Sequence, residues 1–159
     1  MSTAHNISLT VNGEAVRESV EVRKTLVDFL REDLGLTGSH VGCEHGVCGA
    51  CTVRVDGAVV RGCLVLAVQC DGARVETIEG VSDSGALLDL QNAFEKRNAL
   101  QCGYCTPGML LAAEELLAAG GAPDREKIRA HISGNYCRCT GYEAIVDAIE
   151  AVAQARGKK

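Results

Sequence analysis

The chain has 159 residues, a net charge of -5 and nine cysteines, against two phenylalanines, three tyrosines and no tryptophan. An acidic balance without a basic stripe argues against nucleic acid as the main partner, and no run of about 18 apolar residues is available to span a membrane. The cysteines are fewer than the ~8–10% of a disulfide scaffold but more than an ordinary enzyme domain carries, so they require an explanation other than packing.

The first half of the chain reads as strands around one short helix. Residues 7–11 alternate apolar and polar side chains, Asn12-Gly13 is typical of a type I′ turn, and residues 16–22 return as a second strand. Residues 26–30 then change to helical spacing, and Gly35 is expected to end that helix.

A loop rich in glycine and cysteine separates this helix from a second hairpin. Residues 52–55 and 58–61 flank Asp56-Gly57, a turn signal of the same type. Residues 64–68 form a short apolar run that is expected to be buried, and residues 75–78 are expected to be the last strand. The predicted order is therefore two strands, a helix, the cysteine loop and three strands.

From residue 81 onward the strand signals end, and apolar residues recur at helical spacing. Four helices are predicted, so the chain divides near residues 79–84 into an α+β half and a helical half. The helix caps are expected from a Ser-Asp-Ser group at 82–84, from Thr106 followed by Pro107, from Asp124, and from a capping box between Thr140 and Glu143.

The first 12 residues contain no basic region, no apolar segment and no twin arginine, so a cytoplasmic protein is expected. In reducing cytosol, grouped cysteines more often bind metal or do redox chemistry than form disulfides. An odd total also leaves at least one cysteine unpaired. Metal binding is therefore the leading interpretation.

Four cysteines of the first half, spaced C-x4-C-x2-C-x11-C, match the plant-type [2Fe-2S] pattern. Glycines in the same loop permit the positive φ angles with which backbone N–H groups can turn toward thiolates. A structural zinc site normally shows two C-x2-4-C pairs and fits this spacing poorly. His45 is placed as in a Rieske half-site, but a second Cys/His pair is missing, so it is interpreted as a loop side chain. The expected ligands are Cys43, Cys48, Cys51 and Cys63.

Four further cysteines, spaced C-x2-C-x31-C-x-C, lie in the helical half. Each pair precedes a predicted helix, so two helix N-termini could favour the negative charge of one metal cluster. Zinc is a stronger alternative for this set, because C-x2-C is a common zinc-binding pair. Cys70, the ninth, has no partner at ligand spacing and is interpreted as a small buried residue. The expected ligands of the second cluster are Cys102, Cys105, Cys137 and Cys139.

Together, residues 41–51, 101–109 and 134–142 resemble the small iron–sulfur chain of the xanthine oxidase family of molybdenum hydroxylases. The resemblance spans nearly the whole chain and includes all eight cysteine positions. It implies a β-grasp, plant-type ferredoxin-like domain over residues 1–80 and a four-helix bundle over residues 81–159, each holding one [2Fe-2S] cluster. Tyr104 stands where phenylalanine is common in the family.

The resemblance also implies two partner subunits. In this family the glutamine before C-x2-C, here Gln101, hydrogen-bonds a molybdopterin cofactor in a large subunit, and a second pterin contact is implied around Cys139. The cofactor is expected as the cytosine dinucleotide. The helical-half cluster lies nearer the molybdenum, and the β-grasp cluster faces a medium subunit that binds FAD. The implied assembly is a heterotrimer or its dimer.

No GxGxxG motif, phosphate loop or substrate cavity is evident in the sequence. The chain is therefore expected to relay electrons within a multi-subunit oxidoreductase, with substrate chemistry on a partner chain. Two alternatives remain open. One is a free two-cluster ferredoxin, and the other is a structural zinc-binding interaction protein.

Overall fold

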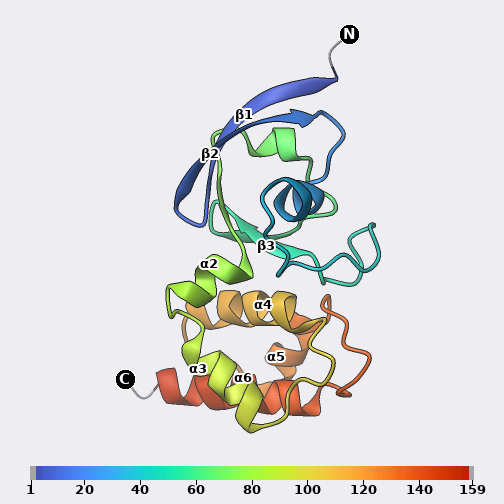
Figure 1. The fold of residues 1–159 in the computed structure, drawn as a ribbon. Coiled ribbons are helices and arrows are strands. Elements are labelled where there is room, and N and C mark those ends of the chain that lie inside the picture. Colours follow the sequence, from blue (N-terminus) through green and yellow to red (C-terminus); the bar gives the residue numbers. More distant parts are fainter. Residues whose placement is uncertain (1–2, 158–159) are drawn as a thin grey trace.

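The computed structural model describes residues 3–157, and it has the α+β composition that the sequence predicts. A five-stranded sheet lies at one end of the molecule, and the longer helices lie at the other (Figure 1). The elements are β1 (Ala4–Val11), β2 (Glu14–Glu21), α1 (Leu26–Asp28) with its π-helical continuation Phe29–Asp33, β3 (Thr52–Val55), β4 (Ala58–Arg61), a 3-10 turn at Ala67–Cys70, β5 (Arg74–Glu76), α2 (Ile78–Asp83), α3 (Leu88–Lys96), α4 (Thr106–Ala118), α5 (Arg125–Ile132) and α6 (Glu143–Arg156).

The strand order is β2-β1-β5-β3-β4, in which β1 and β5 are parallel and the other pairs are antiparallel. Both hairpins occur where they are predicted. Asn12 and Gly13 have φ angles of 51° and 87°, and Asp56 and Gly57 have φ angles of 50° and 87°. Two consecutive positive φ angles are what a type I′ turn requires.

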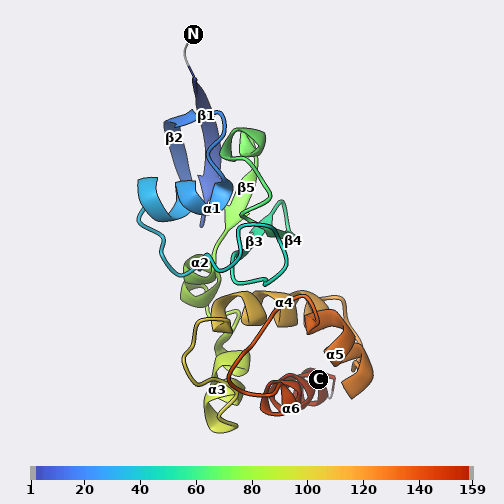
Figure 2. The same ribbon diagram turned by 90° about the vertical axis from the view of Figure 1, so that its right-hand side faces the viewer.

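Helix α1 and its continuation pack on one face of the sheet (Figure 2). Leu26, Phe29 and Leu30 are fully buried there against strand residues. Cys70 is 1% exposed in the same core, and burial raises the pKa of its thiol. The expected buried run at 64–68 is wrong at its start, because Leu64 is 62% exposed.

The boundary between the sheet and the helices differs from the predicted one. Strand β5 ends at Glu76, and Ile78 begins α2. Asn12 explains the early end of the strand, because its side chain accepts a hydrogen bond from Thr77 N at 2.8 Å and donates one to Thr77 Oγ1 at 3.0 Å. These bonds fix Thr77 at the turn, and Ile78 joins the core of the helices.

The predicted helix caps are only partly correct. Asp124 caps α5 through a 2.8 Å hydrogen bond from Lys127 N. Thr106 is instead the first helical residue of α4, with Cys105 at the cap position. Tyr142 occupies the N-cap position of α6 in a left-handed conformation without a capping hydrogen bond from its side chain, and Leu87 rather than the Ser-Asp-Ser group precedes α3. Among residues 3–157, no helix combines the length and apolar character needed to cross a membrane.

Candidate metal centres

The first set of cysteines is brought together by the β3–β4 hairpin and the loop before it. Cys51 immediately precedes β3, and Cys63 follows β4. Antiparallel pairing of Thr52 with Arg61 therefore places these two cysteines at the same end of the hairpin, where Gly62 N donates to Cys51 O at 3.0 Å. Both cysteines are buried, at 2% and 9% exposure.

Backbone N–H groups of the loop donate to the thiol of Cys43, one of the other two cysteines of this set. Cys48 N donates to Cys43 Sγ at 3.4 Å. Hydrogen bonds from the backbone N–H of His45, and then of Cys48, lower the pKa of the Cys43 thiol to about 6. Burial has the opposite effect on Cys51 and raises its pKa to about 11. The loop therefore stabilises the thiolate form of Cys43 but not that of the buried Cys51.

Left-handed backbone lets this loop curl around its sulfur atoms. Glu44, Gly46 and Gly49 have φ angles of 57°, 81° and 76°. A Cβ atom added to Gly42 would lie 3.0 Å from Cys48 Sγ, closer than side-chain carbons normally approach. The loop thus packs closely around its cysteine sulfur atoms and turns backbone N–H donors toward them. Such an arrangement suits an anionic metal–sulfur cluster.

The second set of cysteines gathers between the start of α4 and the loop before α6. Cys102 Sγ and Cys139 Sγ are 3.5 Å apart. The Thr140 hydroxyl donates to Cys137 Sγ at 3.1 Å and accepts from Tyr142 N at 3.2 Å. Thr140 therefore does not form the predicted capping box with Glu143. Burial, and then the neighbouring Cys137, raise the pKa of the Cys105 thiol to about 12.

The thiols of both sets approach one another in pairs. Cys102 Sγ and Cys139 Sγ are in contact, and the thiols of Cys48, Cys63 and Cys137 contribute to the pKa shifts of Cys43, Cys51 and Cys105, respectively. Among residues 3–157, no group of three or more His, Cys, Asp or Glu side chains is arranged to hold a single metal ion. A two-iron cluster takes two protein ligands per iron, so paired thiols suit its chemistry.

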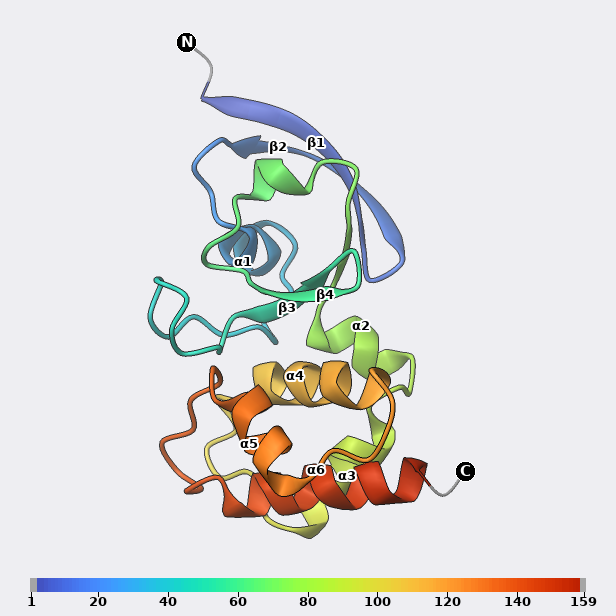
Figure 3. The ribbon, with the colours of Figure 1, turned by 180° about the vertical axis from the view of Figure 1, so that it is seen from behind.

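A cavity of about 180 Å³ lies at the second set of cysteines and reaches Cys48 of the first. The peptide N–H of Tyr136 also donates to the Cys48 carbonyl at 2.8 Å, so the two cysteine loops are hydrogen-bonded directly. Both loops project from the same side of the molecule, one before β3 and the other before α6 (Figure 3). The cavity is lined by Cys102, Cys105, Cys137, Cys139, Tyr104, Tyr136 and Arg138 from the helical half and by Gly42, Cys48 and Ala50 from the sheet half.

Gln101 and Cys139, for which the family resemblance implies a pterin contact, lie together at the surface. Gln101 Nε2 donates to Cys139 O at 3.1 Å, and both residues are exposed. The amide is therefore already held by the loop that carries two of the expected ligands. The side-chain oxygen of Gln101 has no hydrogen-bond partner within residues 3–157 and can accept a further hydrogen bond.

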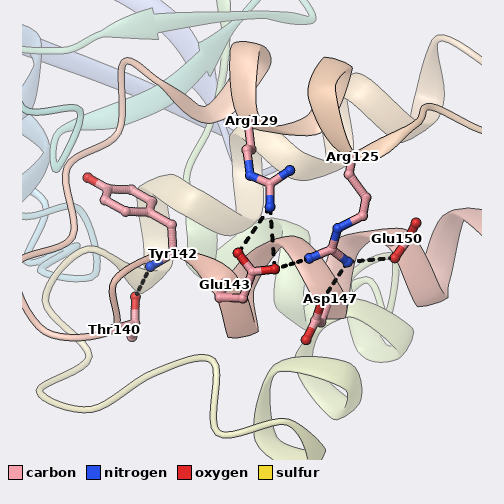
Figure 4. Close-up of polar contacts among 7 residues, drawn as sticks. All are labelled: Arg125, Arg129, Thr140, Tyr142, Glu143, Asp147 and Glu150. Atoms are coloured by element: carbon pink, nitrogen blue, oxygen red, sulfur yellow. Dashed lines mark hydrogen bonds and ion pairs between the residues drawn. The ribbon is translucent and has the colours of Figure 1, made fainter.

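An ion-pair network holds α5 against the start of α6, directly after the second pair of cysteines (Figure 4). Arg125 bonds Asp147 at 2.6 Å and Glu150 at 2.7 Å, and it also contacts Glu143. Arg129 bonds Glu143 at 3.0 Å, and this bond, opposed by burial, keeps the pKa of the Glu143 carboxyl below its ordinary value. The network fixes the position at which α6 begins.

Some residues at the site were not anticipated from the sequence. Asn135 and Arg61 connect the cysteine loops by side-chain hydrogen bonds. His40 stacks on Tyr104 with ring centroids 4.5 Å apart. Asn135 lies inside residues 134–142, which contain two of the predicted ligands, whereas Arg61 and His40 carry no signal that cysteine spacing could reveal.

The chain matches two family models and several characterised proteins. Residues 9–79 match the model of a 2Fe-2S iron-sulfur cluster binding domain, and residues 77–150 match that of a [2Fe-2S] binding domain. Caffeine dehydrogenase subunit gamma of Pseudomonas sp. (strain CBB1) is 52% identical over 94% of this chain and 92% of its own length. Nicotine 6-hydroxylase small subunit of Paenarthrobacter nicotinovorans is 54% identical over 90% of this chain and 86% of its own.

The chain is also similar in fold to a solved structure. A chain in the crystal structure of quinoline 2-oxidoreductase from Pseudomonas putida 86 superposes with a TM-score of 0.91 at 52% identity. The match covers 99% of this chain and 100% of that one. The two chains are therefore similar in sequence and in fold over nearly their whole lengths.

Proposed function

The chain belongs to the family of small iron–sulfur subunits of xanthine-oxidase-type molybdenum hydroxylases, and on this premise we propose that it binds two [2Fe-2S] clusters and relays electrons between two partner subunits. It is an oxidoreductase subunit whose substrate chemistry takes place on a partner chain. Bound to this chain, the clusters supply one-electron transfer, and the residues of the chain hold them and set their surroundings.

For the first cluster we assign Cys43 and Cys48 to one iron and Cys51 and Cys63 to the other. The thiol pairing supports this division. The N–H groups of the loop donate toward Cys43, so they offset negative charge on that side of the cluster. Residues 1–80, with their β-grasp-like sheet and helix, form the domain that holds it.

For the second cluster we assign Cys102 and Cys139 to one iron and Cys105 and Cys137 to the other. The 3.5 Å separation of Cys102 and Cys139 supports this assignment. The Thr140 hydroxyl donates to Cys137 and favours its thiolate. The holding domain is residues 81–159, which we assign as a four-helix bundle with the short α2 at its start.

The proposed relay has two ends. Gln101 and the Cys139 backbone, exposed beside the second cluster, form the contact for a molybdopterin, as its cytosine dinucleotide, in a large subunit. The first cluster faces an FAD-binding medium subunit, and the three chains assemble as a heterotrimer or its dimer. The observation that carries the proposal is the cavity of about 180 Å³, which is lined by all four cysteines of the second set and by Cys48 of the first.

Cysteine replacement tests the two ligand sets. In anaerobically purified and reduced protein, wild type should give two distinguishable [2Fe-2S] EPR signals. Cys137→Ser should remove one of these signals, and Cys51→Ser should remove the other. Cys70→Ser is the matched control, because Cys70 is buried in the sheet core and should leave both signals.

Two outcomes would contradict the assignment. If Cys137→Ser and Cys51→Ser removed the same signal, the division into two sets would be wrong. Colourless protein that contains zinc and gives no EPR signal would establish the structural zinc alternative.

Copurification distinguishes a subunit from a free ferredoxin. The subunit should be recovered with polypeptides that carry molybdopterin and FAD, whereas a free ferredoxin would be recovered alone.

A further inference from the structure

A buried polar junction connects the two cysteine loops without involving a cysteine side chain. We call the group formed by Gly49, Thr52, Arg61, Gly134 and Asn135 the loop junction. Asn135, from the helical half, is only 2% exposed. Its Nδ2 donates to Gly49 O at 3.1 Å and to Thr52 Oγ1 at 3.3 Å, both in the sheet half.

Arg61 binds the same junction from the opposite direction. Its guanidinium, at the end of β4, donates to Gly134 O at 2.8 Å and to Asn135 Oδ1 at 3.2 Å, and also to Thr52 Oγ1. Both ends of the Asn135 amide are therefore bonded across the boundary between the halves. A charged, multidentate donor and a fully bonded buried amide favour one geometry over alternatives.

The backbones at the junction are too close to slide past each other. A Cβ atom on Gly49 would lie 2.5 Å from Gly134 O, and one on Gly108 would lie 2.3 Å from Gly49 O. Strands β3 and β4 rest directly on α4 at this place (Figure 2). The hydrogen bonds of the loop junction thus form where close backbone contacts leave the two loops little room to shift relative to each other.

The junction lies next to a direct backbone hydrogen bond between the two cysteine loops. Tyr136, which follows Asn135, donates its peptide N–H to Cys48 O at 2.8 Å. Cys48 is an assigned ligand of the first cluster, and Cys137, one residue beyond Tyr136, is an assigned ligand of the second. A shift of residues 134–136 would therefore move one ligand relative to the other.

We propose that Asn135 and Arg61 are positioning residues that fix the separation and orientation of the two clusters, and with them the coupling between the clusters. This inference rests on the proposed function, because it requires both clusters to be present. Neither side chain ligates iron. Their role is to hold the Tyr136-to-Cys48 hydrogen bond and the loops on either side of it.

The test measures the magnetic interaction between the two reduced clusters in the full chain, together with iron content and the g values of each cluster. The variants are Asn135→Ala, Asn135→Asp and Arg61→Met. Asn92→Ala on α3 and Arg54→Met on β3 are matched controls in the two halves, because Asn92 is exposed and Arg54 belongs to no part of the junction. Asn135→Asp keeps the size of the side chain but turns its donor into an acceptor that faces Gly49 O.

The junction variants should keep both clusters and the g values of each, and should lose or narrow the splitting caused by spin–spin interaction. Electron transfer between the clusters after rapid partial reduction should slow in the same variants. The controls should match wild type in all these measurements. A conservative Arg61→Lys replacement should recover part of the interaction, because it keeps the charge but not the full set of donors.

Unchanged splitting and unchanged transfer in Asn135→Ala, with both clusters bound, would overturn the positioning role. Loss of a cluster in Asn135→Asp as well as in Asn135→Ala would also overturn it, because the Asn135 side chain itself would then be needed to retain the cluster. Failure of the proposed function is a different result: wild-type protein itself would lack one of the two signals.

Discussion

Tyr104 links the two cysteine loops through a hydroxyl that phenylalanine would not have. The phenol donates to Val41 O at 2.8 Å, and the ring stacks on His40 at an interplanar angle of 18°. His40 Nδ1 in turn lies 2.8 Å from Tyr104 O. A side chain that is 48% exposed thus has a defined position because its polar end is bonded to the other loop.

Tyr104→Phe should therefore destabilise the chain modestly, by about 0.5–1.5 kcal/mol, since one hydrogen bond is lost and the ring contact remains. This corresponds to a fall of a few degrees in the unfolding midpoint, at about 2–4 °C per kcal/mol for a chain of this size. Tyr136→Phe is the control, because the exposed Tyr136 hydroxyl meets no partner within residues 3–157. Equal midpoints for the two variants would show that the Val41 bond is not stabilising.

Glycine at position 49 is required for two reasons at once. Its φ angle is 76°, and an added Cβ would meet the Gly134 carbonyl, which cannot move aside as a flexible side chain could. Gly57 shares only the first requirement, since its φ is 87° and no atom lies within 4 Å of an added Cβ. The two positions separate backbone strain from close approach between the loops.

Gly57→Ala should cost about 1–2 kcal/mol from the left-handed conformation alone and leave both clusters intact. Gly49→Ala should cost more and should weaken both the contact between the loops and retention of iron. Thermal unfolding and iron content of the two variants measure the difference. Equal effects from both substitutions would contradict a close contact at Gly49.

At the scale of elements, local sequence predicted the hairpin turns correctly but placed several helix caps wrongly. The Asn-Gly and Asp-Gly hairpins were predictable because two adjacent residues determine each turn. The predicted caps at Thr106 and Thr140 were wrong because the cysteine turns continue into the helices. Thr106 N bonds Gly103 O, and the Thr140 hydroxyl bonds Cys137 Sγ. Contacts made in the folded structure there outweigh the ordinary capping preference.

The C-terminal helix is tied to two other helices by one side chain. Arg156 on α6 bonds Asp89 on α3 at 2.8 Å and Glu114 on α4 at 2.8 Å. Arg156→Met should lower stability by about 1 kcal/mol, the upper part of the range for partly exposed pairs, because several bonds form one network. Arg23→Met is the control, since the Arg23–Glu21 pair is almost fully solvated and should contribute almost nothing.

The same network predicts a dependence on pH. Hydrogen bonding to Arg156, opposed by burial, lowers the pKa of the Asp89 carboxyl from its ordinary value of 3.8. A carboxyl with a lowered folded-state pKa stabilises the fold above its unfolded pKa, and this contribution is lost as pH falls through the folded value. The midpoint difference between wild type and Asp89→Asn, taken at one scan rate, should therefore be full at pH 7 and shrink below about pH 4. A difference that grew on acidification would have the wrong sign.

At the scale of the whole molecule, the sequence was most informative where the chemistry is local. Cysteine spacing predicted two sets of neighbouring thiols. In the structure Cys102, Cys105, Cys137 and Cys139 line one cavity, while Cys43 neighbours Cys48 and Cys51 neighbours Cys63. Spacing could not reveal how the halves meet, because Arg61 and Asn135 are 74 positions apart and their contact depends on the packing of β4 against the start of the second loop. Contacts of that range carry no periodic signal.

The most direct test of the central claim is quantitative EPR, with iron and acid-labile sulfide analysis, on the anaerobically purified and fully reduced protein. Two [2Fe-2S] signals of equal spin count per chain, with iron and sulfide in the stoichiometry of two such clusters, are the expected result. A single [2Fe-2S] signal accounting for all the iron, or zinc in place of iron at either cysteine set, would contradict it.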